Sequence, residues 1–257
     1  MVRSPCRVCG APSPFVFAQH IIGHQVAYFD CPSCGYLQTE TPYWLDQAYS
    51  SAINDVDTGI LQRNQLNVGR VIMTLHTTRQ LSGRVVDHAG GYGILVRALR
   101  DAGVDAYWRD KYCDNLLARG FEATEARYDL LTAFEVFEHL VTPLNDLRAM
   151  LETAETVLLS TELIASSESP ATDWWYFGPE HGQHIGFFRT VTLRWMAAQL
   201  GVHMQTDGTS VHLFSRRPIS PYWTWAVRHG RRLWPVVARL NLKSRTMLDF
   251  AALRARR

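Results

Sequence analysis

Two carboxylates and an imidazole stand close together in the segment Glu135-Val136-Phe137-Glu138-His139. If the chain turns helical at Glu135, the side chains at positions i, i+3 and i+4 share one face of the helix. Carboxylate oxygens and an imidazole nitrogen on one face suit a hard divalent cation such as Mg²⁺ or Mn²⁺. The alternative interpretation is a metal-free polar cluster that packs beside a ligand.

Two more histidines, His181 and His184, lie three residues apart in a stretch at 173–188 that is rich in aromatic residues. An imidazole titrates near physiological pH, so either side chain is a candidate general base. Aromatic faces beside polar groups are also the surfaces on which sugar rings stack. The stretch therefore predicts a sugar-binding loop that carries a base.

Four cysteines form two pairs, Cys6-x-x-Cys9 and Cys31-x-x-Cys34, and each pair is followed directly by a glycine. Such pairs supply four thiolates in a tetrahedral arrangement, and the glycine permits the tight turn under the metal. A four-thiolate site has no open position, so we expect a structural Zn²⁺ that stabilises folding. Cys113 stands alone and is expected to be a small core residue.

The element that positions a ligand is a strand that runs through Asp87 into a turn containing Gly90, Gly91 and Gly93, followed by a helical pattern. A turn so poor in side chains lets the backbone approach a ligand closely. The next strand ends at Asp110, and an acid at that place can accept hydrogen bonds from ribose hydroxyls. The turn lacks the Gly-Lys-Ser/Thr of a phosphate loop and the Gly-x-Gly-x-x-Gly of a dinucleotide fold, so it predicts a nucleoside site of another kind.

Strand and helix patterns alternate along the chain, which implies right-handed βαβ crossovers and a parallel sheet with helices on both faces. The carboxyl ends of parallel strands meet at one edge of the sheet, where ligands bind. The expected strands are 84–87, 105–109, 128–134, 156–160, 202–206 and 210–215, with a short piece near 121–124, and the expected helices lie within 43–80 and at 92–102, 112–119, 143–152 and 190–200.

The composition is that of a globular protein, with 257 residues, 47% of them hydrophobic and 19% charged, enough for one α/β core and a small appendage. No apolar run approaches the ~20 residues needed to span a bilayer, and no apolar leader is seen at the start of the sequence. We therefore expect a cytoplasmic protein.

The charge is distributed unevenly. From Pro218 onward, nine Arg and Lys residues stand against one acid, Asp249, a net of +8, whereas the rest of the chain carries 17 bases and 23 acids, a net of −6. A basic tail that also contains Trp223, Trp225 and Trp234 could bind nucleic acid, an anionic membrane surface or an acidic partner. A packed C-terminal helix with a solvated arginine face is the alternative that we favour.

The glycine turn resembles the first motif of class I S-adenosylmethionine-dependent methyltransferases, which is an acid followed by Gly-x-Gly-x-Gly. Ala89 replaces the first glycine, a mild departure if its φ is negative. The resemblance implies a Rossmann-like fold with a mostly parallel seven-stranded sheet, in which the turn surrounds the methionine moiety of the cofactor. The implied cofactor-binding residues are Asp87, Gly90, Gly91, Gly93, Asp110 and Phe134, and Arg63 is either the partner of the cofactor carboxylate or a solvated surface residue.

The Glu-x-x-Glu-His segment is similar to the Mg²⁺-binding motif of plant small-RNA 2′-O-methyltransferases and of ubiquinone-pathway O-methyltransferases. In the former group a downstream histidine completes the site, a role that His181 or His184 would fill here. The metal ligands implied by this resemblance are Glu135, Glu138, His139 and His184.

The segment 183–188 is similar to the Glu-His-x-x-Tyr-Phe segment of deoxysugar C-methyltransferases, which also carry an N-terminal four-cysteine zinc ribbon. The histidine is catalytic in that family, and the role carries over to His184. Gln183 stands where the family has glutamate, which weakens the case for proton abstraction from carbon.

We therefore expect an S-adenosylmethionine-dependent methyltransferase that acts on a hydroxyl of a sugar or glycoside, with His184 as the preferred base and His181 second, and with Glu138 and His139 beside the acceptor. The rival within the fold is C-methylation of a nucleotide-linked keto sugar. The rival from another class is a zinc-ribbon nucleic-acid-binding protein.

The expected partner is a small-molecule or oligosaccharide acceptor rather than nucleic acid, and the aromatic and basic surfaces are compatible with a homodimer. The expected domains are a zinc ribbon at 1–42, a helical cap at 43–80, the cofactor-binding domain at 81–217 and a basic helical extension at 218–257.

Overall fold

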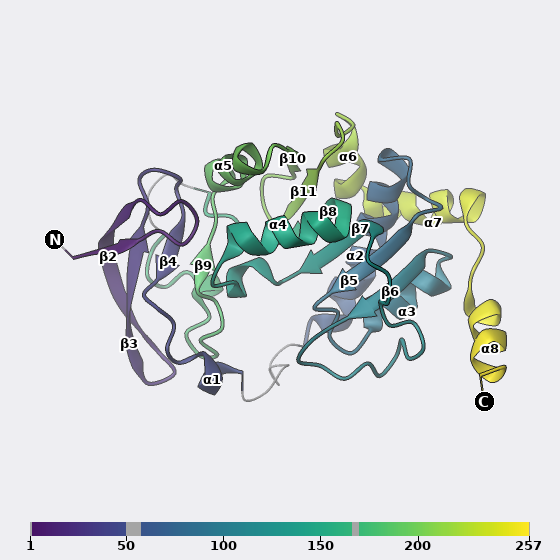
Figure 1. The fold of residues 1–257 in the computed structure, drawn as a ribbon, viewed down its shortest axis with the longest axis horizontal. Coiled ribbons are helices and arrows are strands. Elements are labelled where there is room, and N and C mark those ends of the chain that lie inside the picture. The colour runs from purple at the N-terminus through teal and green to yellow at the C-terminus, as the bar shows by residue number, and fades with distance from the viewer. Residues whose placement is uncertain (1, 50–57, 166–169, 257) are drawn as a thin grey trace.

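The computed structural model describes residues 2–49, 58–165 and 170–256. A small antiparallel sheet lies at one end of the molecule, a larger sheet with helices lies beside it, and the last two helices of the chain lie toward the other end (Figure 1). The candidate site is built where the small sheet meets the larger one.

The larger sheet has the strand order β10-β11-β8-β7-β5-β6. Strands β8, β7, β5 and β6 run parallel to one another, while β11 and β10 add to the β8 edge in antiparallel orientation. This arrangement confirms the Rossmann-like fold. The strands are β5 (Arg84–His88), β6 (Asp105–Arg109), β7 (Tyr128–Phe134), β8 (Ala154–Ser160), β10 (His203–Thr206) and β11 (Val211–Ser215).

Helices cover both faces of this sheet. Successive side chains of each strand point to opposite faces, so they pack in two different hydrophobic cores. Val85 packs in the core formed with α2 and α3, whereas Val86 packs in the core formed with α4 and α5. Leu130 and Leu131 divide in the same way. The helices are α2 (Ile60–Thr77), α3 (Ile94–Asp101), α4 (Pro143–Thr153) and α5 (Thr190–Leu200).

The helix expected at 112–119 is not formed, because the amides in its middle bond elsewhere. The N–H groups of Leu116 and Leu117 donate to the main-chain oxygen of Tyr92 at 3.3 and 3.0 Å, and that of Ala118 donates to the Asn115 side chain at 2.9 Å. In a helix these groups would bond to carbonyls one turn earlier in the chain. At the start of the segment, Asp110 accepts hydrogen bonds from the N–H groups of residues 112 and 113 at 2.7 and 2.9 Å. The segment is therefore an irregular loop that keeps Asp110 in place.

The larger sheet contains six strands in the described part of the chain rather than the seven expected. At the remaining edge position, beside β6, a single parallel bridge joins Trp108 to Glu122. The short piece expected near 121–124 thus lies where a seventh strand would pair, but it is reduced to one bridge.

The small sheet has the order β1-β2-β3-β4-β9. Four of its strands come from the N-terminal region, and the fifth comes from the loop that follows β8, far along the chain. Its strands are β1 (Arg3–Pro5), β2 (Pro12–Ile21), β3 (His24–Asp30), β4 (Leu37–Thr39) and β9 (Gly186–Phe187). The helix expected within 43–80 comprises α1 (Leu45–Ala48) and α2, and residues 50–57 between them lie outside the described residues.

The C-terminal region folds into α6 (Trp223–Arg228), α7 (Gly230–Asn241) and α8 (Thr246–Arg254). A Cβ added to Gly69 would lie 3.1 Å from the carbonyl carbon of Gly230, so these two glycines allow α2 and α7 to cross closely. None of the helices in the described residues combines the length and apolar character needed to span a bilayer.

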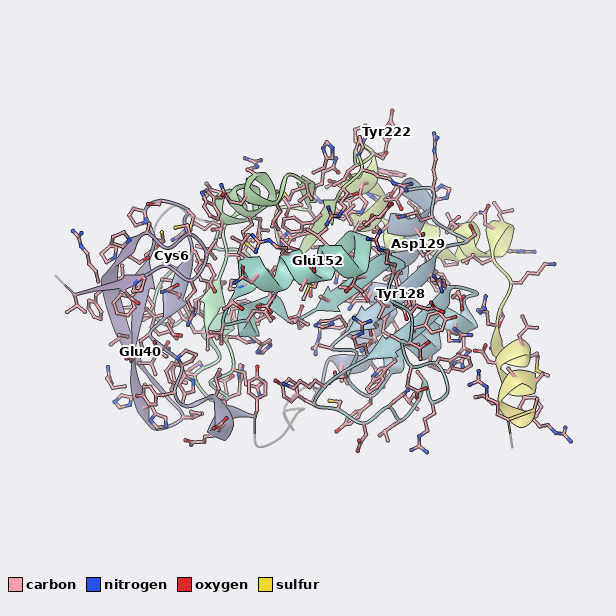
Figure 2. The ribbon with its side chains drawn as sticks, viewed as in Figure 1. Cys6, Glu40, Tyr128, Asp129, Glu152 and Tyr222 are labelled. Atoms are coloured by element: carbon pink, nitrogen blue, oxygen red, sulfur yellow. The ribbon has the colours of Figure 1, made fainter. Side chains whose placement is uncertain are left out.

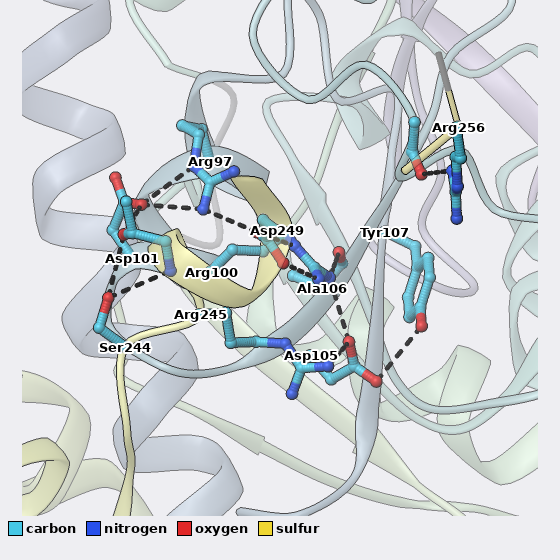
Figure 3. Close-up of polar contacts among 12 residues, drawn as sticks. Arg97, Arg100, Asp101, Asp105, Ala106, Tyr107, Ser244, Arg245, Asp249 and Arg256 are labelled. Atoms are coloured by element: carbon cyan, nitrogen blue, oxygen red, sulfur yellow. Dashed lines mark hydrogen bonds and ion pairs between the residues drawn. The ribbon is translucent and has the colours of Figure 1, made fainter. Parts of the chain in front are cut away.

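Polar contacts hold α8 against α3, one of the helices that cover the larger sheet (Figure 3). The Arg100 guanidinium donates to both carboxylate oxygens of Asp249, at 2.8 and 2.7 Å, and both side chains are almost fully buried. Arg97 donates to the same carboxylate at 2.9 Å. The single acid of the basic extension therefore serves as its anchor.

Candidate active site

The four predicted zinc ligands converge in the small sheet, with their Sγ atoms all within 4.8 Å of one another. The Sγ atoms of Cys6 and Cys34 are 3.6 Å apart and those of Cys9 and Cys31 are 3.4 Å apart, and all four thiols are free. Four sulfurs around Zn²⁺ at about 2.3 Å stand roughly 3.8 Å from one another. The geometry therefore suits a structural Zn²⁺; Figure 2 shows Cys6 and neighbouring sulfur atoms in this sheet.

The glycine turn has a left-handed backbone at Gly91 and Gly93, whose φ angles are 53° and 84°. Ala89 also has a positive φ, 56°, so the expectation of a mild departure at this position is wrong. A left-handed backbone strains a residue that has a Cβ, and such strain tends to collect at ligand sites. The turn thus keeps its glycine-type geometry without the first glycine.

Asp87 lies buried at the base of this turn. Its carboxylate accepts a hydrogen bond from the Thr132 hydroxyl at 2.6 Å, and a Cβ at Gly90 would come within 2.9 Å of its Oδ2 atom. Burial raises the pKa of Asp87 to about 7, against the opposing effect of the Thr132 bond. Gly90 therefore leaves room for the acid directly under the turn.

Asp110 joins the same turn from the end of β6. Its Oδ2 atom accepts a hydrogen bond from the Gly91 N–H at 2.9 Å, and the Trp108 indole N–H donates to the Gly91 oxygen at 2.7 Å. The structure therefore brings Asp87, Gly91 and Asp110 together at the carboxyl edge of the sheet, as the sequence predicts.

Two other predicted cofactor residues lie farther out. Phe134 is the last residue of β7 and is half-buried, and Arg63 is exposed in the first turn of α2. Their contacts with the cofactor remain predictions.

A second group of polar residues gathers where β7 ends: Glu138, His139 and His184 each place a ligand atom within 4.8 Å of the others. Glu138 is fully buried, and within the described residues neither of its carboxylate oxygens makes a close hydrogen bond. Burial, and next the carboxylate of Glu135, raises the pKa of Glu138 to about 8, against the weaker opposing effect of the nearby Tyr176 and Thr161 hydroxyls. A buried carboxylate without a close hydrogen bond is costly, so it indicates a missing ligand such as a cation.

Both histidines of this group are oriented by main-chain oxygens. The Nδ1 atom of His139 lies 3.0 Å from the Gln183 oxygen, and that of His184 lies 2.6 Å from the Tyr176 oxygen. A carbonyl only accepts, so each Nδ1 carries the hydrogen and each Nε2 keeps its lone pair. Metal-binding histidines are typically fixed by a bond of this kind.

Burial also keeps the two imidazoles neutral. It lowers the pKa of His139 to about 4 and that of His184 well below its ordinary value; His139 also disfavours charge on His184, and His181 disfavours charge on both. Neutral imidazoles are good ligands, whereas a strongly lowered pKa makes His184 a weak base on its own. The geometry therefore favours metal binding over unaided base catalysis.

Glu135 does not join this group, and the helix expected to begin there is absent. Its φ is 55°, and the chain forms only a short 3₁₀ turn, η1 (Phe137–His139). The Glu135 N–H donates to the Ser160 hydroxyl at 2.8 Å, and that hydroxyl donates to the Glu135 carboxylate. Ser160 at the end of β8 thus holds Glu135 away from the shared helix face that the sequence predicts.

His181 lies beside the group but is engaged otherwise. Its ring is 4.7 Å from that of His184, and its Nδ1 atom accepts a hydrogen bond from the Gln183 N–H at 3.1 Å. A Cβ at Gly178 would lie 2.1 Å from its Nε2 atom, so the ring packs on glycine backbone. This position suits support of His184 better than base catalysis.

Sequence reasoning missed Tyr49 as a site residue. Its hydroxyl lies 3.0 Å from Nδ1 of His139, and its ring stacks with that of Tyr112 at 6.2 Å. In the sequence it reads only as part of an apolar helical pattern, and nothing there links it to His139. The rings then continue from His139 through His184 and Tyr176 to Trp175, at centroid distances of 4.9, 4.6 and 5.2 Å.

A Rossmann-like sheet with this turn and a polar group at its carboxyl edge defines a class of enzymes, the class I methyltransferases. A family model described as a methyltransferase domain matches residues 61–206, more than half of the sequence, and the chain belongs to this family. It is an S-adenosylmethionine-dependent methyltransferase.

The chain is similar to several solved structures. A Burkholderia thailandensis 1,6-didemethyltoxoflavin N1-methyltransferase, solved with its substrate and S-adenosylhomocysteine, matches 80% of this chain and 100% of its own at 14% identity and a TM-score of 0.51. TnmH matches at 18% identity and a TM-score of 0.46, over 68% of this chain and 62% of its own. The magnesium protoporphyrin IX methyltransferase of Synechocystis, solved with S-adenosylmethionine, matches at 18% identity and a TM-score of 0.42, over 68% of this chain and 93% of its own. No curated protein sequence matches the chain.

Proposed function

We propose that this methyltransferase acts on a hydroxyl group of a sugar or glycoside and uses a divalent metal held by Glu138, His139 and His184. The observation that carries the proposal is the buried Glu138 carboxylate, which makes no close hydrogen bond in the described residues and lies beside two imidazoles that are oriented and neutral. Two nitrogen ligands with one oxygen ligand favour Mn²⁺ over Mg²⁺, because imidazole suits transition metals. Glu135 is bound to Ser160 and is left out of this ligand set.

On the donor side, Asp87, the glycine turn and Asp110 would hold S-adenosylmethionine. Its sulfonium is a good leaving group when bound, so alignment of the acceptor oxygen supplies most of the acceleration. Asp110 is the residue that would accept from the ribose hydroxyls, and Gly91 gives the backbone room to approach the methionine moiety. Asp87 lines up with Thr132 of the neighbouring strand β7, and the chain of β7 leads on to Glu138. The two groups of residues therefore belong to one edge of the sheet.

On the acceptor side, the metal would supply a Lewis acid that makes a hydroxyl easier to deprotonate. In the absence of the metal, His184 is the residue that would take up the proton of the acceptor hydroxyl. The metal-ligand role is the better supported of the two because burial lowers the pKa of His184.

The surrounding rings support a sugar as the acceptor. Tyr112 is 75% exposed and Trp175 is 71% exposed, and they lie at opposite ends of the series of rings that passes through His139 and His184. Exposed flat faces beside polar ligands suit a sugar ring, whose C–H groups pack on aromatic faces.

O-methylation is better supported than C-methylation. The Gln183 side chain donates to the Ala48 oxygen at 2.8 Å, and its main-chain oxygen binds His139. Gln183 is therefore engaged in holding the loop and offers no carboxylate for removal of a proton from carbon.

The test is methyl transfer from labelled S-adenosylmethionine to a panel of free and nucleotide-linked sugars, with product mass spectrometry. Protein treated with a chelator to remove weakly bound divalent cations, with its zinc content measured, is compared with protein supplied with Mn²⁺ or Mg²⁺. We expect O-methylated product that depends on added metal, more with Mn²⁺ than with Mg²⁺. Full activity in protein that has lost its other divalent cations but retains its zinc would overturn the metal part of the proposal, and a C-methylated product would overturn the hydroxyl as the acceptor.

A further inference from the structure

The segment that carries His184 belongs to two parts of the molecule at once. Directly after His184, β9 pairs antiparallel with β4, so that Phe187 faces Leu37 and Gly186 faces Gln38. The loop after β8 thereby completes the sheet that contains the four cysteines (Figure 1). The zinc ribbon is for this reason one wall of the candidate active site.

Ile185 is the joint between the two parts. Its N–H donates to the main-chain oxygen of Glu138 at 2.8 Å, which ties it to the metal-ligand group. Its own oxygen accepts from the N–H of Thr39 at 3.0 Å and from the Thr39 hydroxyl at 3.4 Å. The residue next to His184 is therefore bound on one side to a ligand residue and on the other to the ribbon.

Arg7 adds a further contact from inside the first cysteine pair. Its Nη2 atom donates to the Ile185 oxygen, and its Nη1 atom donates to the Glu40 oxygen at 3.4 Å. The Arg7 N–H is in turn held by the Gln38 side chain at 2.7 Å. Because Arg7 lies between Cys6 and Cys9, its backbone position follows the turn that the metal closes.

The second cysteine pair contacts the same segment. A Cβ at Gly186 would lie 1.9 Å from the Tyr36 hydroxyl, so only glycine fits beneath this buried ring. The Arg189 side chain donates to the Gly35 oxygen at 2.6 Å and to both oxygens of the Asp30 carboxylate. Both cysteine turns therefore hold the stretch 184–189, from opposite ends.

We infer that Arg7 is a positioning residue for His184, through which the four-cysteine site keeps this imidazole beside Glu138 and His139. Three contacts fix the position of the loop relative to the four-cysteine site. They are the guanidinium bond to Ile185, the fit of Tyr36 on Gly186 and the pairing of β9 with β4. The inference deepens the proposed function, since it concerns a residue of the same site. It concerns the placement of His184 alone and holds whichever acceptor is methylated.

The experiment replaces Arg7 with alanine in the full chain and uses Arg3→Ala, an exposed arginine of the same ribbon, as the matched control. The readout is the imidazole carbon-bound proton signals in NMR, with His184 assigned from a His184→Asn variant. His212, which is buried in β11 and bound to Thr161, serves as the internal reference. We expect the His184 signal to shift or broaden in Arg7→Ala and to stay unchanged in Arg3→Ala, while the His212 signal is unchanged in both.

Zinc content and S-adenosylhomocysteine affinity are measured on the same samples, and both should match the parent protein. Mn²⁺ affinity should fall about 10- to 100-fold, the usual cost of removing a group that orients a metal ligand. If Arg7→Ala loses zinc, Arg7→Lys is measured instead, because it keeps the charge and the turn but loses the planar fork. A His184 signal identical to that of the parent, in a variant that retains zinc, would overturn the inference.

The NMR readout requires neither an acceptor nor added Mn²⁺. Failure of every acceptor would therefore count against the proposed function alone. An unmoved His184 signal would count against the role of Arg7 alone.

Discussion

His184 donates its Nδ1 hydrogen to the main-chain oxygen of Tyr176 over 2.6 Å, and this bond decides which ring nitrogen is available for chemistry. His139 is held in the same way by Gln183 at 3.0 Å. Both Nε2 atoms therefore keep their lone pairs, and the two rings meet edge to face at 4.9 Å. Two neutral imidazoles in this arrangement beside a buried carboxylate form a ready set of metal ligands.

Replacing His184 with asparagine should weaken Mn²⁺ binding by at least about 100-fold, because loss of a direct ligand costs no less than loss of a group that orients one. Calorimetric titration with Mn²⁺ gives the affinity, and S-adenosylhomocysteine binding should be unchanged. The control is His203→Asn, since His203 is an exposed residue of β10. Equal Mn²⁺ affinity in the two variants would contradict the metal-ligand role.

Replacing Asp110 with alanine should lower the affinity for S-adenosylhomocysteine by about 10- to 100-fold, because charge-assisted hydrogen bonds contribute roughly 1.5–3 kcal/mol each. The Gly91 N–H would also lose its partner. Calorimetry measures the affinity, and Asp101→Ala, an exposed acid of α3, is the control. An affinity that stays at the parent value would refute the placement of the cofactor.

The stability of the cofactor-free protein should fall as the pH rises, partly because of Asp87. Burial raises its pKa to about 7 in the fold, so the group contributes its full stability below the pKa of the unfolded chain, about 3.9, and loses it as the pH rises through about 7. The change is on the order of 4 kcal/mol at about 1.4 kcal/mol per pKa unit.

Urea unfolding at pH 5 and pH 8 tests this dependence. Asp87→Asn should show a smaller difference between the two pH values than the parent, while the exposed Glu125→Gln should behave like the parent. If the free energy of unfolding changes between pH 5 and pH 8 by the same amount in Asp87→Asn and in the parent, Asp87 is not the group responsible.

Replacing Tyr112 or Trp175 with alanine should raise the KM for the acceptor about 3- to 10-fold, because an aromatic contact contributes roughly 0.5–1.5 kcal/mol. Both side chains are exposed, so the fold should tolerate the change. Tyr222→Ala is the control, since Tyr222 is 73% exposed near α6, away from the site (Figure 2). Steady-state kinetics with the identified acceptor measures the effect, and an unchanged KM in both variants would argue against stacking.

Replacing Arg100 with methionine should destabilise the protein by about 3–5 kcal/mol, because it leaves the Asp249 carboxylate buried with only Arg97 as its partner. The double variant Arg100→Met with Asp249→Leu should recover part of this loss, since both buried charges are then removed. Urea unfolding gives both free energies. A double variant no more stable than the single one would mean that the pair is held for its packing rather than its charge.

The periodicity of the chain predicts the central fold well because parallel buried strands are nearly continuous apolar runs. The strand at 105–109 and the helix at 190–200 are found with the bounds expected from the sequence. The prediction of a helix at 112–119 was wrong, because other hydrogen bonds compete there with those of a helix. The apolar spacing there is helical, but the amides of Leu116 and Leu117 donate to the Tyr92 oxygen and that of Ala118 donates to the Asn115 side chain instead.

The candidate site divides in a similar manner. The cysteine spacing and the glycine turn are local patterns, and the residues they point to lie together in the structure. The metal-ligand group depends on contacts between distant segments. The sequence points to Glu138, His139 and His184, but it wrongly places Glu135 on one helix face with Glu138 and His139. A left-handed residue at Glu135 and its bond to Ser160, 25 positions away, are invisible to helical spacing.

The sequence by itself determined the class of enzyme, the cofactor and the four-cysteine site, because each follows from residues close together along the chain. The tertiary structure decided which histidine nitrogens are free and which acid is left without a partner. It also decided that Tyr49 and Arg7 reach the site. These features depend on burial and on hydrogen bonds between segments up to 178 positions apart, such as the bond from Arg7 to Ile185, and no local pattern specifies such pairings.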